Sequence, residues 1–307
     1  MRNDLNASII DSGHHFAVTH ASSHLARSRF FDEALDGITQ LRFLDRLVRA
    51  NSLDDIAAAM KKLHALIISG RACIVSLTAD DPSPLAQAVE RLLASLPTPD
   101  GGPTSHDFSE RLLTTGIEIS SSVNFVAKAW SLGTHSADSL GRFLLLSRNL
   151  STGYLWDKVR VQGGAYGGMA MVSYGHPVFA CASYRDPNLS STLSHFEMGL
   201  ADVAAGLDDA AVDQSIIGTI GRLDTPRSPH EKGFNETVSL LCGRTPQFRQ
   251  KVREAVLSAT PKNLAAAAQE LIDNHHSSVT VLGSASSFDK AEKEEVFFAR
   301  EALLTEE

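Results

Sequence analysis

A run of eight residues at positions 97–104 places three prolines and two glycines between two stretches that are rich in regular apolar patterns. Proline lacks an amide hydrogen and fixes φ, so neither a helix nor a strand is expected to continue through this run. We therefore predict a linker over residues 97–114, which separates a module at 1–96 from a second module at 115–307. A chain of 307 residues also fits about two domains, at roughly 150 residues each.

Both modules mix the apolar periods of helices and strands. Before the linker, helices are predicted at 28–50, 52–68 and 83–96, and strands at 6–10, 15–20 and 72–78. After the linker, strands are predicted as a pair within 116–126 and at 168–174, 178–184 and 278–282. Helices are predicted at 136–158, from 189 onward, at 208–218, 229–242, 246–258 and 261–273, and at the charged carboxyl terminus. This mixture predicts an α+β fold in which helices pack on one face of a largely antiparallel sheet.

The charge pattern excludes some classes of partner. The chain has 28 basic and 36 acidic residues, a formal net charge of −8, and no basic run interleaved with aromatic residues, so nucleic acid is not an expected partner. No apolar stretch approaches the roughly 18 residues that span a bilayer. The first residues, Met1–Leu5, have no hydrophobic region of the signal-peptide kind. A soluble chain without membrane contact is expected.

The three cysteines have no metal-like spacing. Cys73 and Cys181 lie in apolar runs and are predicted to be buried thiols in strands, while Cys242 ends a predicted helix. Free thiols of this kind favour a reducing compartment, either the cytoplasm or the interior of an organelle.

Twelve histidines suggest a metal site, but their spacing argues against one. Zinc peptidases place two histidines one helical turn apart with a glutamate, as HExxH or HxxEH, and neither pattern occurs in this sequence. The cluster of His14, His15, His20 and His24 is therefore interpreted as solvated or locally hydrogen-bonded side chains. No GxSxG motif of a serine hydrolase occurs either.

A glycine-rich run at 163–168 lacks the lysine and hydroxyl residue of a phosphate-binding loop. It also follows a predicted helix, whereas a dinucleotide-binding fingerprint follows a strand. Glycines in such a run indicate a sharp turn and a close approach of the backbone to another strand, a partner or a ligand.

With its flanking residues, this run forms the block LWDKVRVQGGAYGG at 155–168, followed by SYRDPN at 183–188. Both blocks resemble the presequence protease subfamily of the insulinase/pitrilysin zinc peptidases. Weaker matches continue through 217–254 and upstream at 16–19 and 33–37, so the resemblance covers nearly the whole chain.

The resemblance implies two-layer α+β modules, of which residues 1–96 would be part of a third domain and 115–307 the fourth domain. In such enzymes the amino-terminal half binds zinc, and the carboxyl-terminal half completes the site with an arginine and a tyrosine. The matching positions are Arg160 and Tyr166, with Gly163, Gly164 and Ala165 as expected substrate-binding residues. The substrates would be short unfolded peptides, and the adjacent strand could pair with a peptide along its edge. Arg185 is expected to form a structural ion pair.

This chain has no zinc motif of its own, so zinc would be bound by an amino-terminal half on the same or a separate polypeptide. The chain alone is expected to be inactive. Met1 is interpreted as the start of a fragment, of a truncated gene product or of a genuine short gene. Two alternatives remain open, namely a non-catalytic subunit that pairs with a zinc-bearing chain and a degenerate binding or structural protein. In a eukaryote the compartment would be the mitochondrial matrix or the plastid stroma.

Overall fold

A computed structural model describes residues 2–68, 73–97, 107–133, 136–173 and 175–304. Most of the predicted linker, residues 98–106, lies outside the described residues. The chain forms two compact units: one contains the described residues of 1–45, 108–224 and 247–307, and the other those of 46–107 and 225–246. The first unit holds the sheet.

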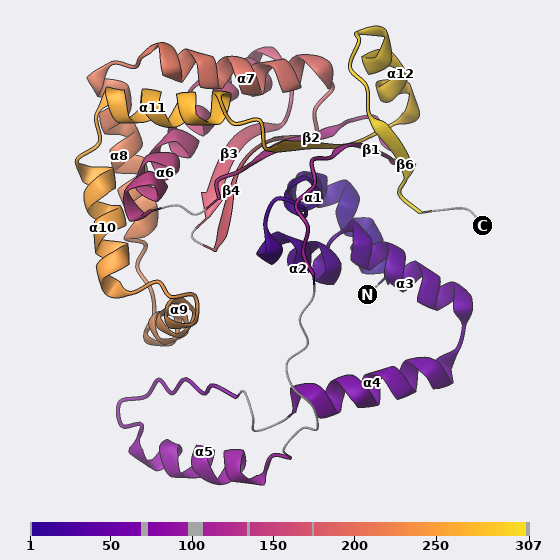
Figure 1. The fold of residues 1–307 in the computed structure, drawn as a ribbon, viewed down its shortest axis with the longest axis vertical. Coiled ribbons are helices and arrows are strands. Elements are labelled where there is room, and N and C mark those ends of the chain that lie inside the picture. The colour runs from indigo at the N-terminus through magenta and orange to yellow at the C-terminus, as the bar shows by residue number, and fades with distance from the viewer. Residues whose placement is uncertain (1, 69–72, 98–106, 134–135, 174, 305–307) are drawn as a thin grey trace. The chain divides into compact units, whose positions relative to one another are not determined.

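The first unit is built on a six-stranded sheet in the order β3-β4-β2-β5-β1-β6 (Figure 1). Antiparallel ladders join β3 to β4, β4 to β2 and β2 to β5, whereas β1 runs parallel to β5 and β6. The strands are β1 (Thr114–Glu118), β2 (Phe125–Ser131), β3 (Gly167–Ser173), β4 (His176–Tyr184), β5 (Ser277–Gly283) and β6 (Ala299–Ala302). The strands predicted at 168–174, 178–184 and 278–282 are present as β3, β4 and β5, and the predicted α+β class is confirmed. The strand pair predicted within 116–126 is wrong, because β1 ends at Glu118 and β2 begins only at Phe125.

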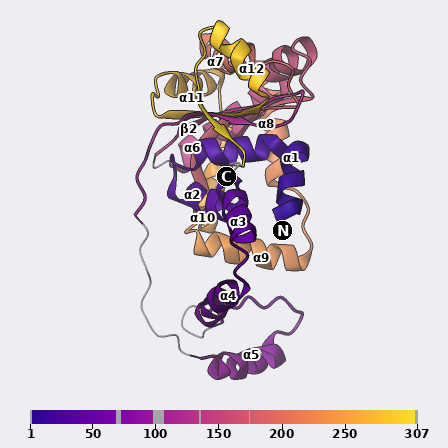
Figure 2. The same cartoon turned by 90° about the vertical axis from the view of Figure 1, so that its right-hand side faces the viewer.

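Helices cover both faces of this sheet (Figure 2), so the expectation that they pack on one face is wrong. Alternate side chains of β2 enter different cores: Phe125 packs with α1 (Arg2–Ser22), whereas Val126 and Trp130 pack with α6 (Ala137–Thr152) and its neighbours on the other face. Because neighbouring side chains of a strand point to opposite faces, β2 contributes to two hydrophobic cores, one on each face of the sheet.

The face of the sheet that holds Phe125 is covered by α1, which spans residues 2–22. The two strands predicted at 6–10 and 15–20 are therefore wrong. The buried residues Ile9, Gly13, Phe16 and Ala17 recur at helical spacing. The Asp11-Ser12-Gly13 sequence marks a kink at Ser12 within the helix, and Gly13 lies directly against the ring of Phe125. Tertiary packing therefore overrides the local turn signal.

The helix predicted at 28–50 is divided at Gly37 into α2 (Arg27–Asp36) and α3 (Ile38–Ala50). Glu33 is only 4% exposed, and its Oε1 accepts hydrogen bonds from the Thr39 amide at 2.9 Å and the Thr39 hydroxyl at 3.0 Å. A side chain on Gly37 would collide with this carboxylate, so the break depends on both residues.

The remaining helices of the first unit follow the predicted order, with one change before β3. The helix predicted at 136–158 ends as α6 at Thr152, and a π-helix, η2 (Trp156–Gln162), follows. The others that belong wholly or mainly to this unit are α7 (Ser190–Ala205), α8 (Asp209–Leu223), α10 (Pro246–Leu257), α11 (Pro261–Ile272) and α12 (Ala285–Lys293).

The second unit contains α4 (Leu53–Ile67), α5 (Ser83–Ser95) and α9 (Pro229–Leu241). None of these three helices has a buried residue. The strand predicted at 72–78 is wrong over its described part, since residues 73–78 form no ladder, and Cys73 is exposed. By contrast Cys181 is fully buried in β4, as predicted.

Candidate functional site

Arg160 and Tyr166 lie together where η2 leads into the edge strand β3. The guanidinium carbon of Arg160 lies 4.0 Å from the ring centroid of Trp156 and 5.8 Å from that of Tyr166. A guanidinium on an aromatic face is favoured electrostatically, most strongly by tryptophan. Trp156 is a supporting residue that the motif alone does not indicate, although its position four residues before Arg160 on a helix is a signal that the two side chains can meet.

The backbone and ring of Tyr166 are fixed by the end of β4. Its amide donates to the carbonyl oxygens of Tyr184 at 3.0 Å and Arg185 at 3.4 Å. Its ring meets the ring of Tyr184 edge-on, with centroids 5.6 Å apart. The side chain of Tyr166 is nevertheless 68% exposed, so its hydroxyl is accessible to a ligand.

The turn at Gly163, Gly164 and Ala165 closes the end of η2. The three amides donate to the carbonyl oxygens of Lys158, Arg160 and Val159 at 3.0–3.1 Å. Gly164 adopts φ +81°, the left-handed conformation that glycine tolerates best. These three amides are bonded within the chain, so only the carbonyl groups of the turn could bond to a peptide. The substrate-binding role of the three residues stays a prediction.

The close approach expected of the glycines occurs within the chain. A Cβ atom on Gly163 would lie 2.6 Å from the carbonyl oxygen of Val159, and one on Gly168 would lie 2.9 Å from that of Leu155. Both distances are shorter than real Cβ contacts allow. Gly163 therefore lets the chain turn tightly at the end of η2, and Gly168 lets the start of β3 pack directly on η2.

The edge of β3 is partly occupied. Ser151 on α6 accepts a hydrogen bond from the Ala170 amide at 2.8 Å, and its hydroxyl lies 3.1 Å from the Ala170 carbonyl oxygen. An added peptide strand could therefore pair with the edge before Ala170, but pairing farther along β3 requires displacement of Ser151. This restricts the edge-pairing mode that the sequence suggested.

Two residues of α1, Asp11 and His14, contact the end of β4 beside Tyr166. Arg185 forms the expected ion pair, 3.4 Å from Asp11, and lies over the ring of Tyr184. The ring of His14 lies 4.7 Å from that of Tyr184. Burial, with a smaller effect of His15, lowers the pKa of His14 to about 4, so this ring is neutral near pH 7.

Comparison with known families decides the assignment. The model described as the PreP C-terminal domain matches residues 116–285, which include η2, the glycine turn and β3. A second model, described as a domain associated with subfamily C of the M16 peptidases, matches residues 1–47. The chain belongs to the PreP C-terminal domain family. The resemblance to the insulinase/pitrilysin-type presequence proteases is thereby confirmed.

Curated relatives extend the PreP match over most of the chain. Presequence protease 1, chloroplastic/mitochondrial, of Arabidopsis thaliana is 32% identical over 302 residues, which is 95% of this chain and 28% of the relative. Protein HypA of Clostridium perfringens is 29% identical over 260 residues, or 83% of this chain and 26% of the relative. The mitochondrial presequence protease of Danio rerio is 25% identical over 289 residues, which is 85% of this chain and 28% of the relative. The chain thus spans less than a third of the length of each of these relatives.

Solved structures show the same fold. Pitrilysin aligns with 97% of this PreP-type chain and 33% of its own, at a TM-score of 0.61 and 15% identity. A conserved protein from Enterococcus faecalis V583 aligns with 93% of this chain and 68% of its own, at a TM-score of 0.60 and 12% identity. A peptidase M16 inactive domain from Pseudomonas fluorescens aligns with 67% of this chain and 51% of its own, at a TM-score of 0.52 and 15% identity.

The described part of this PreP family member does not fit zinc. Among the described residues, no three or more histidine, cysteine, aspartate or glutamate side chains are grouped so that they could hold a metal ion. His20, for example, lies against Thr280 of the sheet, with its Nδ1 3.0 Å from the hydroxyl oxygen.

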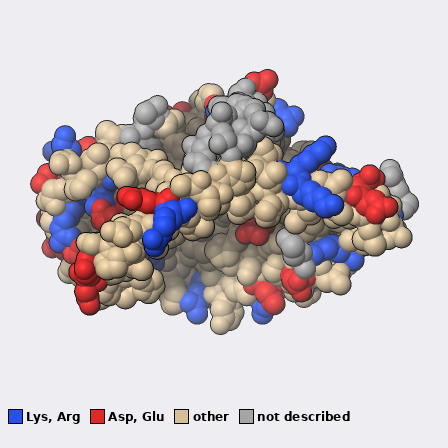
Figure 3. Space-filling model, turned by 90° about the horizontal axis from the view of Figure 1, so that it is seen from below, with Lys and Arg blue, Asp and Glu red and all other residues tan. Residues whose placement is uncertain are grey.

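Two further features are the hydropathy of the described helices and the distribution of charged side chains on one face. None of the described helices is long and apolar enough to cross a membrane. On the face shown in Figure 3, the described Lys, Arg, Asp and Glu residues are interspersed among uncharged ones, without a continuous basic patch. This mixed surface gives no support to a nucleic-acid site on that face.

Proposed function

We propose that this chain is the carboxyl-terminal half of a zinc metalloendopeptidase that degrades short unfolded peptides. It would supply Arg160 and Tyr166 to a metal site carried by an amino-terminal half. The observation that carries the proposal is the grouping of these two side chains, on Trp156 and Tyr184, within the matched PreP domain. Metal chemistry is assigned to the other half, because the described residues offer no metal site.

Tyr166 is proposed to stabilise negative charge on the substrate. Attack of water on a peptide carbonyl creates an oxyanion, and a phenol hydroxyl can donate a hydrogen bond to it. Tyr166 is largely exposed, while its backbone and ring edge are held by β4, so the donor is positioned before a substrate arrives. Removing one such donor typically lowers kcat by about 10²–10³-fold.

Arg160 is proposed to bind a carbonyl group of the substrate and so to fix its register. No carboxylate among the described residues forms an ion pair with Arg160, and Trp156 covers one face of its planar guanidinium. Stacking on a face leaves the in-plane N–H groups available as donors, which suits the fork geometry of arginine recognition.

The peptide substrate and the partner half rest on the family. The curated relatives are more than three times as long as the aligned segment, so most of such a protein lies outside the matched segment. The names of the Arabidopsis and Danio relatives place those two proteins in mitochondria or chloroplasts. An organelle interior, or the cytoplasm of a bacterium, is accordingly the proposed compartment of this chain.

Complementation tests this function. The chain is assayed alone, and then joined to or mixed with the amino-terminal half of the Arabidopsis relative, with cleavage of an unfolded peptide and bound zinc as readouts. We expect no stoichiometric zinc and no cleavage with the chain alone, and cleavage with the combination above that of the amino-terminal half alone. One tight zinc per isolated chain, or a combination no more active than the amino-terminal half, would contradict the proposal. Activity only on covalent joining supports one polypeptide, and activity on mixing supports a separate subunit.

A further inference from the structure

The loop that follows β4 bonds to both ends of the glycine turn. At one end, the Asn188 side-chain amide donates to the Gly163 carbonyl oxygen at 2.7 Å. At the other, the Tyr166 amide donates to the Tyr184 carbonyl oxygen at 3.0 Å. Between them Pro187 lies 3.6 Å from the position of a Cβ atom on Gly164. The loop at 184–188 therefore fixes the turn that separates Arg160 from Tyr166.

Asn188 is itself held by a buried carboxylate. Asp186 is fully buried. Its Oδ1 accepts a hydrogen bond from the backbone amide of Asn188 at 2.8 Å, and its Oδ2 accepts one from the Thr192 hydroxyl at 2.7 Å. Thr192 is 2% exposed and lies in the first turn of α7. A buried charge that is hydrogen-bonded at both oxygens resists reorientation, because the loss of either bond leaves it uncompensated.

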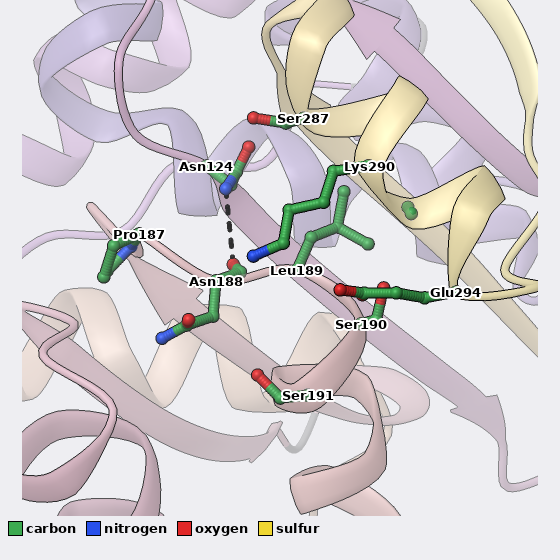
Figure 4. Close-up of a pocket in the computed structure, with 10 residues that line it drawn as sticks. Asn124, Pro187, Asn188, Leu189, Ser190, Ser191, Ser287, Lys290 and Glu294 are labelled. Carbon is green, nitrogen blue, oxygen red and sulfur yellow. Dashed lines mark hydrogen bonds between the residues drawn. The ribbon is translucent and has the colours of Figure 1, made fainter.

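A second asparagine joins this loop to the start of β2. Asn124 and Asp186 exchange backbone hydrogen bonds of 2.7 and 2.9 Å. The Asn124 side-chain amide, which is 2% exposed, donates to the carbonyl oxygens of Asp186 at 3.1 Å and Asn188 at 3.3 Å. Figure 4 shows the second of these bonds at the wall of a small pocket. Asn188 therefore connects the start of β2 to the glycine turn through hydrogen bonds, one at its carbonyl oxygen and one at its side-chain amide.

We propose that Asn188 is a positioning residue for the Arg160–Tyr166 pair, and this inference rests on the proposed function of that pair. The turn at 163–166 contains a left-handed Gly164, and the contact between Arg160 and the Tyr166 ring is long, at 5.8 Å. The first three amides of the turn bond only to η2, whereas the side chain of Asn188 ties Gly163 to the buried Asp186 and to the start of β2. Catalysis is sensitive to displacements of about 1 Å, so this connection is expected to affect turnover.

The test begins with the isolated chain and needs neither metal nor peptide. Trp156 is 46% exposed and stacks on Arg160, whereas Trp130 is buried, so Trp130→Phe leaves Trp156 as the fluorescent reporter. In this background Asn188→Ala is compared with Arg160→Ala, which removes the stack. Asn274→Ala is the matched control, because the Asn274 amide makes a bond of the same kind to the Ser131 carbonyl oxygen at 2.6 Å, away from the turn.

We expect Asn188→Ala to raise the hydrogen-exchange rate of residues 163–167 by about threefold to tenfold. We also expect it to shift Trp156 emission toward that of Arg160→Ala. Asn274→Ala should change neither. If Asn188→Ala unfolds, Asn188→Ser keeps the backbone bond to Asp186 while its side chain is too short to reach Gly163. Unchanged exchange and emission in a folded Asn188 variant, or equal changes in Asn274→Ala, would overturn the proposal.

In the complemented enzyme, Asn188→Ala should lower kcat more than it raises KM. A kcat equal to the unsubstituted enzyme, together with faster exchange at 163–167, overturns the positioning role alone. A Tyr166→Phe variant with full kcat overturns the proposed function instead, so the two failures are distinguishable.

Discussion

At the candidate site, Arg160 and Tyr166 each contact an aromatic side chain. Trp156 holds Arg160 through the face of an indole, and Tyr184 holds Tyr166 through an aromatic edge and a backbone carbonyl. Both contacts leave polar atoms exposed, which a buried hydrogen bond or ion pair to the same groups would not. This arrangement is what a preorganised binding pair requires.

Gly163→Ala tests the close packing of the turn at single-residue scale. A new Cβ atom would lie 2.6 Å from the Val159 carbonyl oxygen, so the turn must shift, and we expect a loss of about 1–3 kcal/mol in the free energy of unfolding. Gly221→Ala on α8 is the control, because no atom lies within 4 Å of its Cβ position and alanine favours a helix. Urea denaturation measures both; equal stability of the two variants would contradict the packing argument.

Glu33 predicts a specific pH dependence. Burial raises its pKa from 4.5 to about 7, opposed by hydrogen bonds from Thr39. The folded state therefore binds this proton more tightly than the unfolded state, so the contribution to stability is complete below pH 4.5 and is lost as the pH rises through about 7. Relative to Glu33→Gln, which stays neutral, the Tm of the unsubstituted chain should fall between about pH 5 and pH 8.

The exposed variant Glu270→Gln provides the control for this experiment. Its Tm should follow that of the unsubstituted chain at every pH. A difference between Glu33→Gln and the unsubstituted chain that does not change with pH would contradict the buried ionisation.

At the scale of elements, the sequence predicts many helices and strands but not which of them pack together. Cys73 and Cys181 lie in similar apolar runs, yet only Cys181 is buried, because β4 pairs on both sides with β2 and β3. The strand pair predicted within 116–126 is wrong: β1 ends at Glu118, β2 begins at Phe125, and β5 lies between them in the sheet. No local pattern contains that strand order.

The helix α1 is the clearest example of a distant cause. Its alternating residues and the Asp-Ser-Gly sequence favour strands and a turn, but its buried face packs on β2, β4 and β5, more than 100 residues away. The site shows the same limit. The motif placed Arg160 and Tyr166 on one turn, whereas the supports from Tyr184 and Asn188 required the register of β3 on β4.

Gly13→Val tests the position of α1. A Cβ atom on Gly13 would lie 2.5 Å from the Phe125 ring, so valine should force α1 from the sheet and lower the Tm by at least several degrees. Asn6→Val, at an exposed position of the same helix, controls for helix propensity. Equal Tm values for the two variants would show that residue 13 does not pack on the sheet.

At the scale of the whole molecule, the chain has a peptidase fold without a metal site in its described part. Its sequence contains twelve histidines but no HExxH or HxxEH motif. Their positions suit other roles: His14 packs on Tyr184, and His20 lies against the sheet. Under the proposed function, Arg160 and Tyr166 would complete a metal site that another half of the enzyme carries.

Tyr166 is proposed to stabilise the transition state at a metal site carried by another half of the enzyme. The most direct measurement is steady-state peptide cleavage by the complemented enzyme carrying Tyr166→Phe, with Tyr154→Phe as the control, since the Tyr154 hydroxyl contacts His195 rather than the glycine turn. We predict that Tyr166→Phe lowers kcat by about 10²–10³-fold with little change in KM, and that Tyr154→Phe leaves both unchanged. A Tyr166→Phe enzyme with the kcat of the unsubstituted protein would contradict the claim.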